Sequence, residues 1–353
     1  MLSDFSYTKE RVDYIIKSFN NISEEVALKH LYSLGLLEMF AKIGMNFLLV
    51  GNMAAYLMGD ENLYLPDNLE IQFHKRDFLD SYLKQINEWC QPVSFIKNQI
   101  NEDFIIYQYI FETYNKLSVT IYLNVKLVNK LSLDVASIAI DKPFIINNDK
   151  IYRVKTVYAE KLIAKALFNF SPIILCDAIN TNDTFELFII KSLLDCIQLV
   201  SKIERFDYIY YDYYDLIDDF KEYYKLDENS KHFLFDSFYA VINIYCKGKY
   251  RKDSYKLLDN GIKAVQEFVI SEKISVDNFF LNVGYPALIY ACIYRNYNYL
   301  NLKISNRKLM LFYNYSKIND MKKYDHNVFN IIYQAIEIFD RLDIIEKTKK
   351  EIL

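Results

Sequence analysis

Residues that interrupt regular structure are scarce in this chain, whose 353 residues include seven glycines and five prolines. Because these two residue types dominate turns and loops, their scarcity predicts helices and strands joined by short connections. The five cysteines are odd in number and widely spaced, and the sequence contains no CxxC pair or Cys/His cluster. This pattern points to neither a disulfide framework nor a zinc site, so no disulfide-linked partner is expected.

Long apolar runs are missing as well. No uninterrupted apolar stretch reaches the roughly 18–20 residues that cross a bilayer. The N-terminal segment, MLSDFSYTKERVDYII, carries charges where a secretory signal would be apolar. We therefore expect a cytoplasmic protein without a membrane partner. A formal net charge of −4 gives no overall attraction to nucleic acid, so contact with RNA would require a local basic patch.

What the sequence does contain is enough apolar material for more than one core. Hydrophobic residues make up 52% of the chain, and two domains are the usual outcome at this length. Strand-like patterns at 47–50, 68–73 and within 93–146 are mixed with helical periodicity at 9–44, 53–58 and 76–89. Helical periodicity dominates beyond about residue 155. The pattern predicts an α+β fold, in which a mixed β-sheet with flanking helices is followed by a C-terminal helical bundle.

The expected domain boundary lies near residue 200. Residues 1–200 would comprise the N-terminal helices, a sheet core at about 45–150, and helices at 157–200 that pack on the sheet. Residues 201–353 would form the helical bundle. Within it, the tyrosine-rich segment 205–224 has an apolar stripe at helical spacing. Core packing is favoured over stacking on nucleobases there, because the interleaved aspartates would repel phosphate.

Three short segments carry polar groups that could perform chemistry. In the first, FLLVGNMAAYLM, an apolar strand ends at Gly51 and turns directly into a helix. Free backbone N–H groups at such a helix N-terminus suit a triphosphate, although an ordinary strand–turn–helix gives the same pattern.

In the second segment, DNLEIQF, alternation places Asn68 and Glu70 on one polar face, about 7 Å apart. Two oxygen ligands at that separation can converge on a divalent ion. The alternative is a half-buried strand that shows its polar side to water. In the third, LSLDVASIAI, Asp134 stands inside an apolar strand pattern, where burial would be costly without a partner. An exposed edge strand is the alternative there.

These segments, in this order, resemble the AbiEii-type abortive-infection toxins, bacterial proteins with a minimal nucleotidyltransferase-like domain. That family shows a Gly-Gly-Thr-Ala-Leu-like turn, a [ST]-x-D-[ILV]-D-[ILV] strand, a later L-D-[IV] strand, an A-E-K-L helix and a K-D-x-x-D-L helix. The corresponding segments here read GNMAAYL, PDNLEI, SLDVA, YAEKLIAKALF and IKSLLDCI. The resemblance covers about residues 30–200 and depends mainly on the A-E-K-L and L-D-V matches.

The resemblance implies a nucleotidyltransferase-like sheet and a two-metal transfer from an NTP, with Mg²⁺ or Mn²⁺ as cofactor. Asn68, Glu70 and Asp134 would hold the metal, and Glu70 and Asp134 would be the catalytic residues. The nucleotide-binding residues would be Gly51, Asn52, Lys161 and Lys191. Lys161 could instead be a solvated helix residue.

The chain departs from the family pattern at the positions that matter for metal binding. Asn52 replaces the second glycine or serine of the turn, and Asn68 and Glu70 replace the paired aspartates. Asn124, in IYLNV, is a second candidate for the position that we assign to Asp134. An asparagine oxygen carries no charge, and glutamate moves its carboxylate by one methylene, so both changes weaken metal binding.

Three functions are therefore compatible with the sequence. The first is a nucleotidyltransferase that modifies RNA, protein or nucleotides in a toxin–antitoxin or phage-defence setting. The second is an inactive pseudoenzyme of the same fold that binds a nucleotide or a partner protein. The third is an interaction module that keeps only the fold. The basic run KGKYRKDSYK at 247–256 is the best local candidate for RNA contact, with a solvated basic loop as the alternative.

Overall fold

The computed structural model describes residues 7–19, 22–75, 77–142, 150–179, 185–227, 229–249, 252–297 and 313–352. The chain forms two compact units. The first comprises Met1–Leu162 and Gln266–Glu272, and the second comprises Ile163–Val265 and Lys273–Leu353. The boundary falls within helix α5 (Ala159–Asn169). The domains expected at 1–200 and 201–353 stay a prediction.

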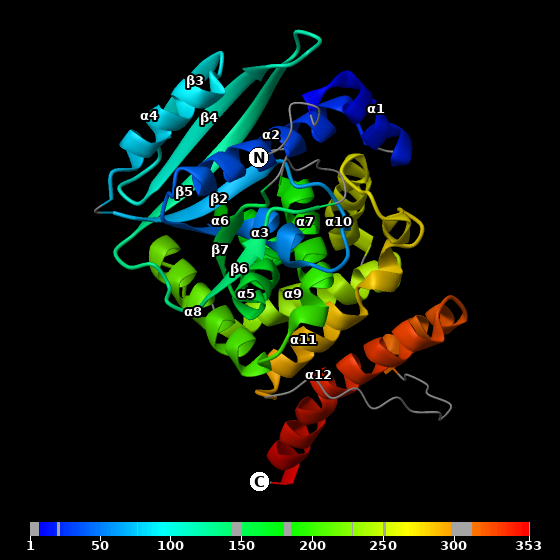
Figure 1. Ribbon diagram of the computed structural model, residues 1–353. Helices are drawn as coiled ribbons and strands as arrows, with labels where there is room; N and C mark the ends of the chain where they lie inside the picture. The colour runs from blue at the N-terminus through cyan, green and yellow to red at the C-terminus, as the bar shows by residue number, and fades with distance from the viewer. Residues whose placement is uncertain are drawn as a thin grey trace. The chain divides into compact units, whose positions relative to one another are not determined.

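A seven-stranded mixed sheet forms the centre of the first unit, with the order β3-β4-β5-β2-β1-β7-β6 (Figure 1). Its strands are β1 (Phe47–Val50), β2 (Asn68–His74), β3 (Ser94–Gln99), β4 (Phe104–Glu112), β5 (Ser118–Val128), β6 (Val135–Ala139) and β7 (Arg153–Val157). The pairs β2–β5 and β1–β7 are parallel, and the other four pairs are antiparallel. The sheet confirms the predicted α+β class.

Strand β2, near the middle of the sheet, has one buried apolar face and one half-buried polar face. Along β2, Leu69, Ile71 and Phe73 are buried, while the alternate residues are half-buried. Helix α2 (Glu24–Lys42) packs on β2 and β5 and also contacts α4 (Leu79–Cys90). The Ser23 side chain accepts a hydrogen bond from the Val26 N–H and caps α2, as the sequence predicts. Helix α1 (Lys9–Ser18) precedes α2.

A short segment from late in the sequence completes the first unit. Tyr64 and Val269 form an antiparallel bridge. The Leu65 N–H donates to the Phe268 carbonyl at 2.9 Å, and the Ile270 N–H donates to the Leu63 carbonyl at 3.0 Å. Because Leu63, Tyr64 and Leu65 are all buried, these backbone bonds satisfy groups that water cannot reach.

The second unit is helical, as predicted. After α5 it contains α6 (Pro172–Ile179), α7 (Phe185–Leu199), α8 (Phe206–Tyr224), α9 (Ser230–Tyr245), α10 (Lys252–Ala264), α11 (Gly284–Tyr294) and α12 (His326–Ile352). Short 3₁₀ helices accompany them at Val200–Lys202, Phe279–Asn282 and Tyr313–Lys323, and two more, Val265–Glu267 and Glu272–Ile274, cross the boundaries of the returning segment Gln266–Glu272. The Tyr290 hydroxyl donates to the Leu167 carbonyl at 2.7 Å and so joins α11 to α5.

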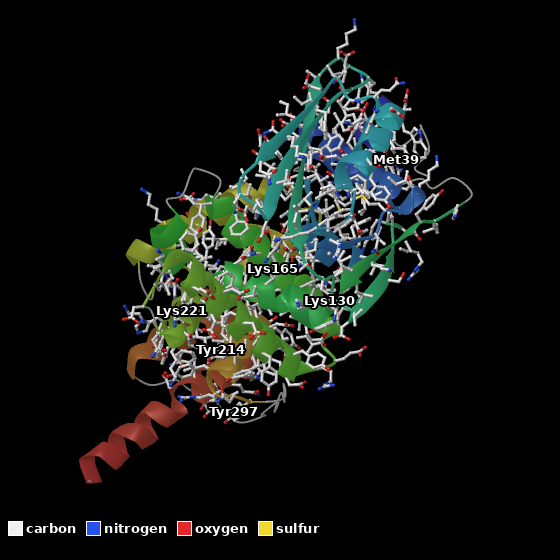
Figure 2. All side chains as sticks on the ribbon, turned by 90° about the vertical axis from the view of Figure 1, so that its left-hand side faces the viewer. Met39, Lys130, Lys165, Tyr214, Lys221 and Tyr297 are labelled. Carbon is white, nitrogen blue, oxygen red and sulfur yellow. The ribbon has the colours of Figure 1, made fainter. Side chains whose placement is uncertain are left out.

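The tyrosine-rich helix α8 packs through the stripe predicted from the sequence. Phe206, Ile209, Tyr213 and Ile217 are buried. Tyr214 and Lys221, labelled in Figure 2, lie on the same helix and are half-buried. Core packing of the stripe is therefore confirmed. In the described part of the chain, no helix is both long and apolar enough to span a membrane. All five cysteines carry free thiols.

Candidate functional site

The turn between β1 and α3 (Gly51–Met58) holds the residues first singled out by the sequence. Gly51 has φ +71°, a conformation that residues with a Cβ rarely adopt. Its backbone also touches the side chain of Glu70, because a Cβ at Gly51 would lie 2.6 Å from Glu70 Cδ and 2.6 Å from Oε1. The antiparallel register explains this contact, since Val50 pairs with Glu70. The turn thus requires glycine, and any side chain at this position would also push the end of the Glu70 side chain aside.

The Glu70 side chain lies on the half-buried polar face of β2, and two residues with amide side chains are its neighbours on that face. Asn68 lies two residues earlier on β2, on the same face, and both residues are half-buried. On the parallel neighbour β5, Asn124 pairs with Glu70 and Tyr122 pairs with Asn68. Paired residues of adjacent strands project to the same side of a sheet. Glu70 is therefore flanked by Asn68 and Asn124.

The structure does not bring Asp134 to this group. Asp134 was expected inside a strand, but it lies in an exposed bend, and β6 begins only at Val135. Two strands, β1 and β7, separate β6 from β2. Three strand spacings amount to about 14 Å. The residue that lies beside Glu70 is Asn124, which the sequence offered as the second candidate.

The two lysines of the predicted nucleotide site lie in different units. Lys161 is half-buried in the first turn of α5 and belongs to the first unit. Lys191 is 8% exposed on α7, in the second unit. Asp195 follows it by one helical turn and accepts a hydrogen bond from the Gln198 side chain at 3.0 Å. Residues four apart are neighbours on a helix surface, so Lys191 has a carboxylate beside it.

The residues around Glu70 do not fit the two-metal arrangement that the family resemblance implies. Glu70 contributes one carboxylate, while Asn68 and Asn124 contribute neutral amides. The described residues contain no group of three His, Cys, Asp or Glu side chains placed to hold a metal. Magnesium in transfer sites is bound through carboxylates together with substrate phosphates. Glu70 alone could contribute to one ion that is held mainly by the phosphates.

A buried contact joins α2 to α3, the helix that begins at the Gly51 turn. No local pattern in the sequence predicts this contact. His30 Nδ1 lies 2.8 Å from the Pro66 carbonyl oxygen, and its ring packs edge-on against Tyr56 with centroids 4.9 Å apart. Burial lowers the pKa of His30 to about 4 and raises the pKa of the Tyr56 hydroxyl. His30 and Pro66 are 36 residues apart, so only the fold reveals that they meet.

The basic run at 247–256 is only partly described. Lys247 Nζ donates to the Asp277 carbonyl at 3.2 Å and lies 4.2 Å from the centroid of the Phe280 ring and 5.4 Å from that of Tyr324. This lysine is therefore engaged by neighbours in its own unit through a hydrogen bond and cation–π contacts. Arg251 lies outside the described residues, as does the side chain of Lys252.

Comparison with known proteins finds similarity at the level of structure alone. No protein family matches the chain, and no curated protein matches it. Among solved structures, it is similar to the crystal structure of an antigenic nucleotidyltransferase-like protein from Paracoccidioides brasiliensis. The two are 12% identical, the TM-score is 0.35, and the match covers 56% of this chain and 89% of the other. The fold class rests on the sheet and helices described above, and the function rests on this chain's own residues.

Proposed function

We propose that this chain is a nucleotidyltransferase-like protein that has lost two-metal catalysis and serves as a nucleotide- or partner-binding module. The observation that supports this proposal is the pairing of β2 with β5, which places the amide of Asn124 beside Glu70. Two-metal transfer uses two metal ions to stabilise the attacking and leaving oxygens, and several anionic protein oxygens are needed to hold those ions. A site with one carboxylate and two amides lacks that charge.

Nucleotide binding would use the groups that the resemblance identifies. The Gly51–Asn52 turn begins helix α3, and a helix N-terminus favours phosphate. Lys161, which belongs to the same unit as the turn, stays the proposed contact to the triphosphate, while Lys191 belongs to the other unit. The Glu70 carboxylate lies against Gly51, however, so it would repel a phosphate bound at the same turn. A divalent ion with the NTP would reduce this repulsion.

The direct test is transfer of α-labelled NTPs, with Mg²⁺ or Mn²⁺, onto total RNA and onto the protein itself. Wild type is assayed beside Glu70→Gln and Asp134→Asn. We expect no label above the level of the Glu70→Gln variant. Calorimetry with ATP and EDTA then measures binding, and Glu70→Gln should bind ATP several-fold more tightly than wild type because a like charge has been removed.

An active transferase in a toxin–antitoxin or phage-defence setting is the second candidate. The retained glycine turn with Glu70 in register beside it favours this candidate. Label that wild type incorporates and Glu70→Gln does not would establish it and refute the loss of catalysis. Loss of label in Asp134→Asn alone would place the site at β6. Absence of both label and ATP binding would leave only the partner-binding role.

A further inference from the structure

The outer edge of the sheet at β3 is open over six residues. β3 pairs with β4 along its whole length, from Ser94 with Ile110 to Gln99 with Ile105. No other described strand pairs with β3 (Figure 1). The last four residues of the strand are exposed. An edge of this kind presents a row of backbone donors and acceptors that can pair with another strand.

Apolar side chains gather at this edge. Val93 is 67% exposed, Ile96 40% and Ile100 57%. Phe78, just before α4, is 81% exposed, and two residues later Asp80 contacts β3. Soluble proteins that stay monomeric usually protect such an edge with charge, proline or a bulge. Large exposed apolar residues gathered beside one edge strand are instead typical of an interaction surface.

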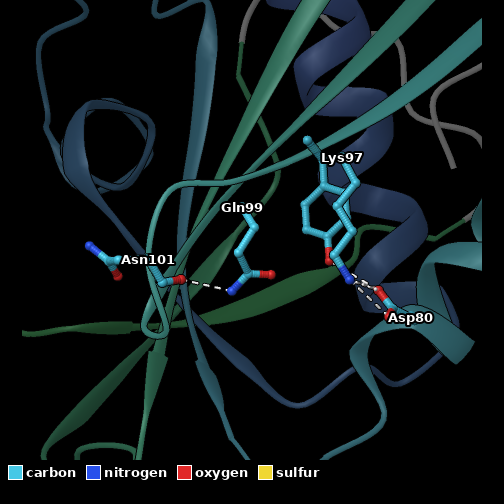
Figure 3. A network of polar contacts seen from close by, with 5 residues as sticks. Asp80, Lys97, Gln99 and Asn101 are labelled. Atoms are coloured by element: carbon cyan, nitrogen blue, oxygen red, sulfur yellow. Dashed lines mark hydrogen bonds and ion pairs between the residues drawn. The ribbon is translucent and has the colours of Figure 1, made fainter.

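The one charge on β3 is turned away from the edge. Lys97 Nζ lies 3.0 Å from both carboxylate oxygens of Asp80, and 5.7 Å from the centroid of the Tyr107 ring (Figure 3). The lysine is therefore paired within its own chain and leans over the sheet, away from the edge. The Gln99 side chain is also bonded within its own chain, since it donates to the Asn101 carbonyl at 2.7 Å.

The opposite edge of the sheet also has exposed apolar residues, Leu133 and Val135, but it differs in its charges and hydrogen bonds. Strand β6 has five residues and is flanked by the charged residues Asp134 and Asp141. Arg153 reaches across from β7 and donates to the Ser137 hydroxyl at 3.0 Å and to the Ser137 carbonyl. Charge and side-chain hydrogen bonds thus protect β6 and leave β3 as the unprotected edge.

We propose that β3 pairs antiparallel with β3 of a second copy of this chain, across a two-fold axis at Ile96. A two-fold axis perpendicular to the sheet keeps corresponding faces of the two copies on the same side of the joined sheet. Residues that oppose one another across the axis must then project from the same face. Pairing about Ile96 places Ile96 against Ile96, Phe95 against Lys97 and Ser94 against Asn98.

The sequence of β3 is self-complementary in this register. The apolar Ile96 pair occupies the axis, where cross-strand contacts are closest. Each Lys97 opposes an aromatic ring rather than another lysine, so like charges do not meet, and a lysine beside an aromatic ring is favourable. A shift of the axis to Lys97 would bring two lysines together, so charge selects Ile96.

Oligomeric mass measured by light scattering over a range of concentrations is the first test. We expect about twice the chain mass of 42.1 kDa. Ile96→Lys should weaken the dimer roughly tenfold or more, because two lysines would then face each other at the axis. Leu133→Lys is the matched control, since Leu133 is 80% exposed near the other edge of the sheet. It should leave the dimer unchanged.

Cysteine cross-linking then tests the register. Directly opposed residues have Cα atoms about 4.5–5.5 Å apart, within the range of a disulfide, so oxidised Ile96→Cys should run as a covalent dimer. Asn98→Cys is the control, because the two Asn98 positions would be about 13 Å apart along the strands. Burial raises the pKa of the nearby Cys90 thiol to about 11, which limits its own reaction.

A monomeric mass at every concentration would overturn the proposal. So would a dimer that Ile96→Lys leaves intact, because the contact would then lie elsewhere. Equal cross-linking of Asn98→Cys and Ile96→Cys would exclude the register at Ile96. Each of these outcomes is independent of nucleotide binding, so the dimer and the proposed function are tested separately.

Discussion

At the scale of single residues, Gly51 is the position that the turn and the carboxylate both constrain. Gly51→Ala should lower the free energy of unfolding by about 1–3 kcal/mol, because left-handed backbone strain is added to the smaller cost of moving the end of the Glu70 side chain aside. Gly44 provides the matched control, since it has the same φ of +71° and a Cβ there would meet no atom within 4 Å. Gly44→Ala should cost only about 1–2 kcal/mol.

Unfolding in denaturant measures the free energy of unfolding of both glycine variants. The difference between them reports the contact of Gly51 with Glu70. Adding Glu70→Ala to Gly51→Ala should recover most of that difference. Equal losses at Gly51 and Gly44 would mean that the carboxylate does not lie against the turn in solution.

The buried His30 leads us to expect that the folded protein loses stability in mild acid. Its pKa is about 4 in the folded protein and 6.5 in the unfolded chain; burial lowers it, while the Pro66 carbonyl and the charge of Asp67 oppose the shift and Lys142 adds to it. Between these two values only the unfolded chain binds the proton, so acid favours unfolding. Lowering the pH from 7 to 5 should therefore cost about 2 kcal/mol through His30 alone.

The His30→Phe variant isolates this effect. It keeps an aromatic ring against Tyr56 and removes the titrating group. Urea unfolding at pH 7 and at pH 5 should show a larger loss in wild type than in the variant. The same pH dependence in both proteins would assign the acid sensitivity to other groups.

At the scale of elements, the pairing of β2 with β5 predicts where a second carboxylate would create metal affinity. Asn124→Asp places two carboxylates side by side, because residue 124 pairs with Glu70. Their repulsion should lower the melting temperature without metal, and Mn²⁺ should raise it again. Thermal melts with and without Mn²⁺ measure both effects. In Asp134→Asn the response to Mn²⁺ should equal that of wild type, because β6 is three strands away.

The same strands show how far the sequence could predict the fold and the site. Alternation identified β2 and its polar face, and Ser23 identified the start of α2, because both signals are local. The strand that pairs with β2 on this side cannot be identified from local sequence signals. The sequence favoured Asp134, because an aspartate matched the family pattern. The parallel pairing with β5 instead placed Asn124 beside Glu70. Strand order depends on crossovers and long-range packing, which periodicity does not encode.

At the scale of the whole molecule, the chain does not divide at one point in its sequence. The segment Gln266–Glu272 belongs to the first unit, and its backbone bonds connect it to Leu63 and Leu65, far earlier in the sequence. A sequence boundary near residue 200 would separate this segment from its partners. The order of elements along the chain therefore does not reveal that a late segment completes the first unit.

A fragment of residues 1–200 tests the consequence. Without Gln266–Glu272, the backbone groups of Leu63 and Leu65 would lose their partners, and Tyr64 would lose its bridge to Val269. Each buried backbone group left without a partner costs about 1–3 kcal/mol. We expect the fragment to melt at a lower temperature than the full chain or to aggregate, as followed by circular dichroism. In the full chain, Ile270→Pro removes one of these donors and should lower stability by a similar amount per bond. A fragment as stable as the full chain would show that residues 1–200 fold without the returning segment.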